Sequence, residues 1–187
     1  MITIISGTNR PGSRTLQFAT ASLELLSEID EDVQLLDLAT IAPQWLHTGM
    51  YTPADITPEL LDIQKRFVLN VDAFIIVIPE YNGSYPGMMK LFIDAISVNE
   101  YPSNFKNKAF ALVGVASGRA GNLRGLDHLA DTIAHMGGWV LPNKLPLSGV
   151  EALLNEDGKV TDEATLTSLR SSAEQLIAAR NRNLIYK

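Results

Sequence analysis

Residues 6–15 carry polar side chains that are suited to hold a phosphate group. The hydroxyls of Thr8, Ser13 and Thr15 can donate hydrogen bonds to phosphate oxygens, and Arg10 can add a charge-assisted contact. The segment ends where a helix is predicted to begin, so the amides and the dipole of that helix start would favour an anion. An ordinary turn capped by Ser13 uses the same residue types, and from these residues alone both interpretations stay open.

The same loop does not match two better-known phosphate-binding patterns. The dinucleotide pattern G-x-G-x-x-G fails because the next glycine after Gly7 is Gly12. The Walker A pattern matches both glycines, but Ser13 stands where a lysine is required. A loop with several hydroxyls and no such lysine suits a terminal phosphate monoester.

A second polar segment, residues 79–87, is the most specific in the chain. It reads Pro-Glu-Tyr-Asn-Gly-Ser-Tyr-Pro-Gly and lies between an apolar strand and a predicted helix. Successive amides at such a turn can point at a planar heterocycle, and they would stabilise the charge that a reduced flavin carries near N1 and O2. Gly83 leaves no side chain to block approach, and Tyr81 or Tyr85 can pack on a ring. A turn whose tyrosines lie in the core would have the same composition.

The elements that must position these loops alternate between strand-like and helix-like segments. Short apolar stretches predict five strands, at Ile2–Ser6, Val33–Leu38, Ala73–Pro79, Ala109–Ala116 and Trp139–Leu141. Helix starts are predicted after Ser13, at Pro58, at Pro86, near Leu123 and after Thr161 or Asp162. This order predicts an α/β fold with a doubly wound parallel sheet, in a single domain over residues 1–187.

In a doubly wound sheet, ligands bind at the carboxyl ends of the strands. The two polar loops follow the first and third predicted strands, and a third loop at residues 117–122 follows the fourth. Ser117 and Gly118 are the candidates in this third loop, with Arg119 a weaker one, while a solvated turn has the same composition. The three loops are therefore predicted to meet at one edge of the sheet.

Both polar loops resemble signatures of one family, the NADPH-dependent FMN reductases, which include azo, quinone and chromate reductases. Residues 79–87 resemble its P-E-Y-N-x-S-x-P-G signature, and residues 7–15 resemble its phosphate loop, G-S-x-R-x-x-S-x-[NS]. The likeness extends over roughly residues 1–150 in element order. It implies a flavodoxin-like sheet with strand order 2-1-3-4-5, FMN as the cofactor, and NADPH or NADH as the electron donor.

The resemblance also assigns residues to the two ends of the cofactor. The residues implied to hold the FMN phosphate are Thr8, Arg10, Ser13 and Thr15. Those implied to face the isoalloxazine ring are Pro79, Glu80, Tyr81, Asn82 and Gly83, with Ser117 and Gly118 beside its pyrimidine. The chain departs from the family pattern at Thr8, Thr15 and Tyr85, which replace a serine, an asparagine or serine, and a smaller aliphatic residue.

Composition and charge argue against several other classes. The net charge of −6 disfavours a nucleic-acid partner, and the absence of cysteine excludes disulfides and Cys-based metal sites. No apolar run approaches the about 20 residues of a membrane helix, and the N-terminus has no signal-peptide pattern, so we expect no membrane contact and a cytoplasmic location. His128, Asp131 and His135 share a helix stripe, but without an H-E-x-x-H pattern we expect a polar face or a subunit contact there and no metal.

These observations predict an enzyme that passes electrons from NAD(P)H through FMN to a small acceptor, by ping-pong hydride transfer. The acceptor, a free flavin, quinone, azo compound or metal oxyanion, is not specified by the sequence. No catalytic side chain is expected, because the flavin performs the chemistry. The alternative is a non-enzymatic electron carrier of the flavodoxin type. A phosphate-binding hydrolase or kinase is disfavoured by the missing Walker lysine.

The apolar loop Trp45–Tyr51 contributes to a prediction about assembly. Together with Tyr81 and Tyr85 it gives many aromatic residues to one rim, which predicts a homodimer or a dimer of dimers with the flavin near the subunit contact. The family resemblance implies the same. The competing interpretations are that this loop lines a substrate pocket, or that it folds over the core of its own subunit.

Overall fold

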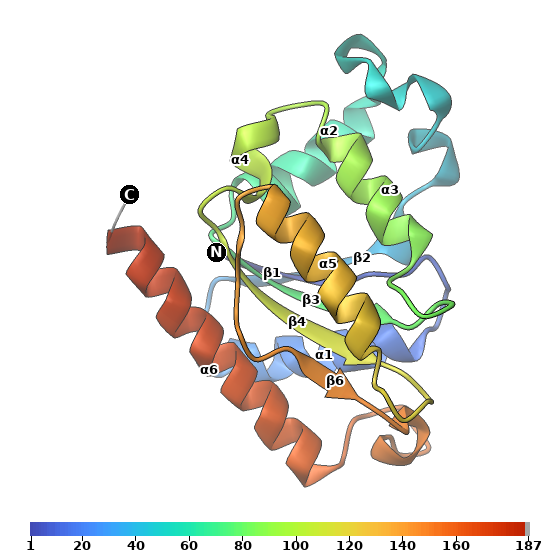
Figure 1. The fold of residues 1–187 in the computed structure, drawn as a ribbon, viewed down its shortest axis with the longest axis vertical. Helices are drawn as coiled ribbons and strands as arrows, with labels where there is room; N and C mark the ends of the chain where they lie inside the picture. The colour runs from blue at the N-terminus through green and yellow to red at the C-terminus, as the bar shows by residue number, and fades with distance from the viewer. Residues whose placement is uncertain (186–187) are drawn as a thin grey trace.

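A six-stranded sheet forms the centre of the molecule (Figure 1). The computed structural model describes residues 1–185, with side chains through residue 182. The strands are β1 (Ile2–Ser6), β2 (Val33–Asp37), β3 (Ala73–Pro79), β4 (Ala109–Val115), β5 (Trp139–Val140) and β6 (Leu145–Leu147). All pairings are parallel, in the order β2-β1-β3-β4-β5, and β6 also pairs with β4. The predicted α/β class and strand order are therefore confirmed, with one strand more than expected.

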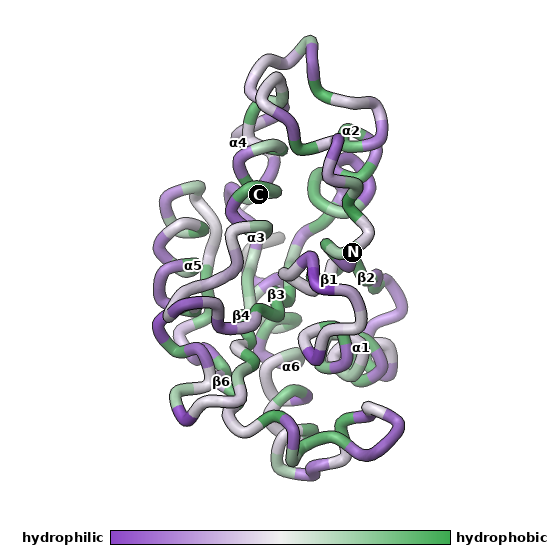
Figure 2. The backbone as a smooth tube through the Cα atoms, turned by 90° about the vertical axis from the view of Figure 1, so that its right-hand side faces the viewer, coloured by the Kyte–Doolittle hydropathy of each residue, from purple (hydrophilic) through white to green (hydrophobic). Residues whose placement is uncertain are grey.

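Helices cover both faces of this sheet. They are α1 (Arg14–Ser27), α2 (Pro58–Gln64), α3 (Gly87–Ile96), α4 (Tyr101–Phe105), α5 (Leu123–His135) and α6 (Glu163–Ile185). One face is covered by α1 and α6, and the other by α2, α3, α4 and α5 (Figure 1). Figure 2 shows the strands as a largely hydrophobic layer between helices of mixed hydropathy. A hydrophobic core therefore lies on each face of the sheet, and both cores pack against the same strands.

The central strands explain why the fold is readable from the sequence. Both faces of β3 and β4 are buried, so these strands are continuous apolar runs without polar alternation. On the α2–α5 side, the Phe74 and Phe110 rings stack with their centroids 4.8 Å apart, and Phe105 meets both rings edge-on. On the other side, Phe18 of α1 and Leu176 of α6 are fully buried. Because both faces are buried, each strand is an apolar run, and the first polar residues after it mark where the loop begins.

Several smaller elements lie outside the predictions. The fifth strand is only two residues long, and the chain returns to β4 as the three-residue β6, which contains Pro146. Proline is rare in strands because it cannot donate a ladder hydrogen bond, so the composition of this segment does not predict a strand. Helix α4, a π-helical turn at Lys65–Leu69 after α2, and the 3₁₀ turns Leu38–Thr40, Pro43–Trp45, Thr48–Tyr51 and Pro53–Asp55 were also not predicted. In the described part of the chain, no helix has the length and apolarity to span a membrane.

Candidate functional site

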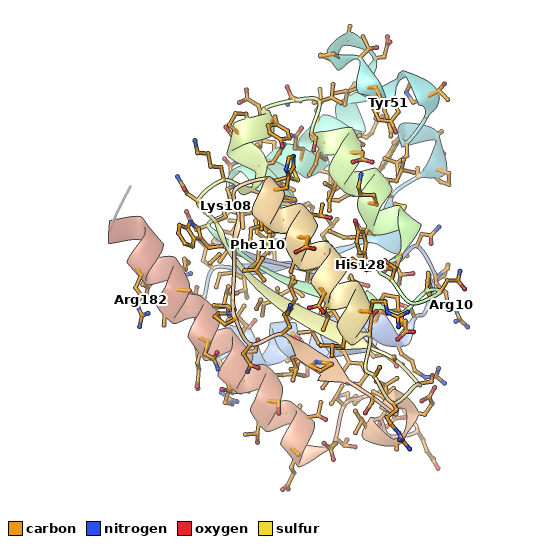
Figure 3. All side chains as sticks on the ribbon, in the orientation of Figure 1. Arg10, Tyr51, Lys108, Phe110, His128 and Arg182 are labelled. Carbon is orange, nitrogen blue, oxygen red and sulfur yellow. The ribbon has the colours of Figure 1, made fainter. Side chains whose placement is uncertain are left out.

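A cavity of about 790 Å³ opens at the carboxyl ends of β1, β3 and β4. Its size is within the usual range for a small-molecule or cofactor site. Its walls come from four segments: residues 10–17, residues 79–81, residues 115–118 and residues 150–158. The first three are the loops that the sequence predicts to meet, and the fourth was not predicted. Figure 3 shows Arg10 at this end of the sheet, with Lys108 at the opposite end.

The loop after β1 is shaped by its glycines and by the start of α1. The amide of Gly7 donates to the Val77 carbonyl at 2.8 Å, and a Cβ at Gly7 would come within 2.7 Å of Ile78, so only glycine lets the loop leave the sheet this closely. Gly12 has a φ of +60°, which reverses the chain before α1. The Ser13 hydroxyl then accepts from the Leu16 amide at 3.2 Å and caps the helix. The helix start therefore faces the cavity with its remaining amides.

Of the four residues implied to hold a phosphate, three line the cavity and one does not. Arg10, Ser13 and Thr15 line the cavity, and Arg10 is exposed at its rim. Thr8 does not line it: the residue is fully buried, and its hydroxyl shares a hydrogen bond of 2.9 Å with the Tyr81 hydroxyl. Thr8 also accepts from the Arg10 amide at 3.3 Å, so it supports the loop from behind.

The loop after β3 contains a tight turn at residues 81–84. Tyr81 and Ser84 exchange two backbone hydrogen bonds of 3.0 and 3.1 Å, and the two central residues, Asn82 and Gly83, have φ values of +53° and +77°. Both values belong to a type I′ turn, for which Asn-Gly is the preferred pair. A Cβ at Gly83 would lie 2.8 Å from a guanidinium nitrogen of Arg124, so this glycine faces α5. The turn itself therefore accounts for Asn82 and Gly83, which do not line the cavity.

Pro79, Glu80 and Tyr81 do line the cavity, and their positions are set by Asn122. The buried Asn122 side chain donates to the carbonyls of Ile78 at 3.2 Å and Pro79 at 2.8 Å, which anchors the end of β3 to the start of α5. Asn122 was not predicted as a functional residue. Its only sequence signal is its place immediately before a helix, which does not reveal a bond to a strand more than forty residues away.

Helix α5 makes two further contacts with the same loop. His128 Nδ1 and the Ser84 hydroxyl share a hydrogen bond of 2.9 Å, and Tyr85 and Thr132 are joined through their hydroxyls at 3.2 Å. His128 therefore acts as a brace for the turn. Among residues 1–182, no group of three or more His, Cys, Asp or Glu side chains is arranged to hold a metal ion.

Ser117 and Gly118 follow β4 and line the cavity, as the predicted meeting of the three loops requires. The Ser117 hydroxyl donates a short hydrogen bond to Oε1 of Glu151, and Arg14 Nη1 lies 3.1 Å from the same oxygen. The Ser117 bond, followed by the backbone amide of Glu151 and the charge of Arg14, holds the pKa of Glu151 below its usual value. Glu151 is thus ionised at neutral pH and is a cavity residue that sequence reasoning missed.

The cavity wall carries charges of both signs. Two guanidinium groups, Arg10 and Arg14, lie on the α1 side, and four carboxylates line the rest, namely Glu80, Glu151, Glu156 and Asp157. Cations beside a helix N-terminus at one end of the cavity favour an anionic group there. The acidic remainder disfavours a second anionic group at the other end of the ligand.

The loop Trp45–Tyr51 lies away from this cavity. Met50 is only 1% exposed, and Trp45 and Leu46 are half-buried against the core on the α2–α5 side. Tyr51 is the exception, with 59% of its surface exposed. Most of the apolar material in this loop therefore packs on its own subunit.

These features fit FMN. The group is elongated, with a phosphate at one end and a planar ring at the other. The start of α1 with Arg10 suits the phosphate, and the Pro79–Tyr81 segment with Ser117 provides the opposite wall. The open space beside Gly12, where an added Cβ would meet no atom within 4 Å, leaves room for a ligand at the helix start.

Comparisons with known proteins agree with this reading. The family description "NADPH-dependent FMN reductase" matches residues 1–151. The chain is 25% identical, over 182 residues covering 95% of this chain and 94% of the other, to the FMN-dependent NADPH-azoreductase of Staphylococcus aureus. The structure is similar to FerB, a flavoenzyme NAD(P)H:(acceptor) oxidoreductase of Paracoccus denitrificans, with a TM-score of 0.75, 23% identity and 97% coverage of both chains. It is also similar to an azoreductase of Bacillus anthracis, with a TM-score of 0.58, 18% identity and coverage of 96% and 98%.

The parallel sheet and its strand order define a flavodoxin-like fold, with a cavity at the carboxyl ends of its strands. Within that class, the chain belongs to the NADPH-dependent FMN reductase family. The predictions of an enzyme, of FMN as its cofactor and of NAD(P)H as its electron donor are thereby confirmed. The binding roles of the individual residues stay predictions.

Proposed function

We propose that residues 1–187 act as one FMN-binding domain that reduces a small acceptor with electrons from NADPH or NADH. The observation that carries this proposal is the cavity in which the loops after β1, β3 and β4 meet, with a helix start and Arg10 at one end. Candidate acceptors are a free flavin, a quinone, an azo compound and a metal oxyanion. The azo compound is the acceptor named for the Staphylococcus aureus relative.

The chain's own residues would bind and orient the cofactor. The phosphate would be held by the α1 start with Arg10, Ser13 and Thr15. The ring would lie against Pro79–Tyr81, whose backbone is fixed by the type I′ turn and by Asn122. When bound, FMN supplies hydride acceptance and electron donation, so the protein needs no acid or base of its own. Thr8, Asn82 and Gly83 are proposed to support this site from outside the cavity.

The test is purification followed by spectroscopy and turnover. The protein should copurify with, or take up, one equivalent of FMN and oxidise NADPH or NADH in the presence of one of the four acceptor classes. Binding of FMN without turnover by either donor would favour the flavodoxin-type electron carrier instead. Failure to bind FMN would refute the proposal.

We also propose that the chain forms a homodimer or a dimer of dimers. Tyr51 and Tyr81 expose 59% and 36% of their surfaces, and Tyr81 lies at the cavity rim. Burying these rings against a second copy would remove apolar surface from water and shield the ring end of the cavity. Light scattering during size exclusion should give at least twice the 20.4 kDa of one chain. A mass of one chain, with reductase activity intact, would exclude the dimer.

A cytoplasmic location is proposed because NADPH and NADH, the donors of this reaction, are metabolites of that compartment. Fractionation of the source cells with an antibody to this chain tests it. Recovery of the protein outside the cytoplasmic fraction would contradict the proposal.

A further inference from the structure

Glu151 joins two parts of the cavity wall that are distant in the sequence. One oxygen of its carboxylate, Oε1, accepts from the Ser117 hydroxyl and lies 3.1 Å from Arg14 Nη1. Arg14 is the first residue of α1, Ser117 follows β4, and Glu151 belongs to the 3₁₀ turn Val150–Leu153. All three residues line the cavity. The carboxylate therefore belongs to the site and has no counterpart in the motifs that identify it.

The direction of the Ser117 hydrogen bond is fixed by chemistry. A serine hydroxyl has one proton and two lone pairs, and an ionised carboxylate can only accept. The lowered pKa of Glu151, caused first by the Ser117 bond and also by Arg14, keeps this carboxylate ionised at neutral pH. The single Ser117 proton is thus engaged by Glu151, and the Ser117 oxygen has only lone pairs to offer to a ligand. A partner at this position must be a hydrogen-bond donor.

Ser117 follows β4, and the proposed ring segment Pro79–Tyr81 begins at the end of the neighbouring strand β3. The Glu80 amide donates to the Val115 carbonyl at 3.3 Å, so the chain segments that leave β3 and β4 run side by side. An oxidised isoalloxazine has one ring N–H, at N3, and this group lies between two carbonyls that can only accept. An acceptor-only hydroxyl matches the N–H and mismatches both carbonyls.

We propose that Glu151 is a positioning residue that holds the Ser117 hydroxyl as an acceptor for the N3–H group of the flavin. This inference rests on the proposed function, because it requires FMN in this cavity with its ring beside Ser117. By orienting one hydroxyl, Glu151 selects which edge of the pyrimidine can lie against the loop after β4. Arg14 compensates the charge of the carboxylate, which reduces its repulsion of the cofactor phosphate.

The test compares FMN with 3-methyl-FMN, in which a methyl group replaces the N3 proton. Dissociation constants are measured by fluorescence titration of the full chain after removal of its flavin. The wild-type protein should bind 3-methyl-FMN about tenfold more weakly than FMN, the scale of one hydrogen bond to a polarised acceptor. Ser117→Ala should bring this ratio to about one to two, because the acceptor is gone. Equal binding of the two flavins by the wild-type protein would overturn the inference.

Glu151→Ala is the decisive variant, since it leaves Ser117 in place and removes the carboxylate that fixes the direction of its hydroxyl. It also shortens a side chain of the cavity wall, which a second carboxylate variant controls for. The ratio should fall to about one third of the wild-type value, because Ser117 can then donate as well as accept. Glu156→Ala, which removes another carboxylate from the same wall, should keep the wild-type ratio. A wild-type ratio in Glu151→Ala would show that Glu151 does not orient Ser117. If the wild-type protein does not bind FMN at all, the proposed function fails first, and this inference fails with it.

Discussion

The two cavity loops that follow the neighbouring strands β1 and β3 are built in different ways. The loop after β3 is held by the type I′ turn at residues 81–84, by Asn122 at Pro79 and by His128 at Ser84. In the loop after β1, residues 9–12 are exposed, and in the described part of the chain the Arg10 side chain makes no ion pair. One loop is therefore shaped by contacts within the protein, and the other keeps its donors for a ligand.

This difference teaches how a substitution in each loop should be measured. Changes in the loop after β3, or in Asn122 and His128 that hold it, should appear in the free energy of unfolding, because they break contacts of the folded chain. Changes at the exposed residues 9–12 of the loop after β1 should appear in cofactor affinity and leave the fold unaffected. The four predictions that follow test this division.

The largest effect is expected from Gly125→Ala in α5. An added Cβ would lie 2.1 Å from Asn122 Oδ1 and 2.8 Å from the Ser84 carbonyl carbon. It would therefore displace the Asn122 side chain and the turn at residues 81–84 together. We expect a loss of about 2–4 kcal/mol in the free energy of unfolding, from overpacking and broken hydrogen bonds. Urea denaturation measures it. Gly87→Ala is the matched control, since its Cβ would meet no atom within 4 Å at the start of α3, and it should not destabilise the protein.

Arg10→Ala should act on the loop after β1. Loss of a charged hydrogen-bond donor is expected to weaken FMN binding by about 1.5–3 kcal/mol, with no change in the urea midpoint. Calorimetric titration of the flavin-free protein measures the affinity, and riboflavin, which has no phosphate, should bind the variant and the wild type equally. Arg119→Ala is a control, because this exposed arginine lies near the cavity but does not line it. Unchanged FMN affinity in Arg10→Ala would show that Arg10 does not hold the phosphate.

The choice of cofactor tests whether the open end accepts more than one phosphate. We expect FMN to bind at least about tenfold more tightly than FAD, a difference of about 1.4 kcal/mol, because a helix start suits a terminal phosphate and FAD would need room for an adenylate beyond it. Titration of the flavin-free chain with each compound decides it. Tighter binding of FAD would contradict the assignment of this end to a terminal phosphate.

The smallest effect is expected from Tyr81→Phe, which cuts a link between the two loops. The Tyr81 and Thr8 hydroxyls share a hydrogen bond of 2.9 Å, and its loss should cost about 0.5–1.5 kcal/mol of folding free energy. A double-mutant cycle with Thr8→Val isolates this contact. A coupling energy of zero would mean that the two loops are held independently.

The sequence predicts the scaffold well because the relevant signals are local. The apolar run Ala73–Pro79 and the cap at Ser13 each specify an element through nearest neighbours, and the order of elements then specifies the sheet. The polar loops could be placed because parallel strands end on one edge. Those predictions needed no knowledge of long-range contacts.

The missed features depend on contacts between distant segments. Asn122 matters because β3 ends beside it, and Glu151 matters because Ser117 and Arg14 lie opposite it, and neither fact has a signal in the neighbouring sequence. Thr8 shows the converse. Its hydroxyl fits a phosphate motif, yet the structure directs that hydroxyl to Tyr81.

The division of the last sheet position between β5 and β6 has a consequence for assembly. This edge offers only two residues and then three, with Pro146 in the second piece and Trp139 exposing 62% of its surface. A strand from another molecule needs a continuous row of free amides and carbonyls, and this edge is too short and lacks the amide of Pro146. The sheet therefore stops growing at β4's partners, and the proposed dimer would not form by strand pairing at this edge.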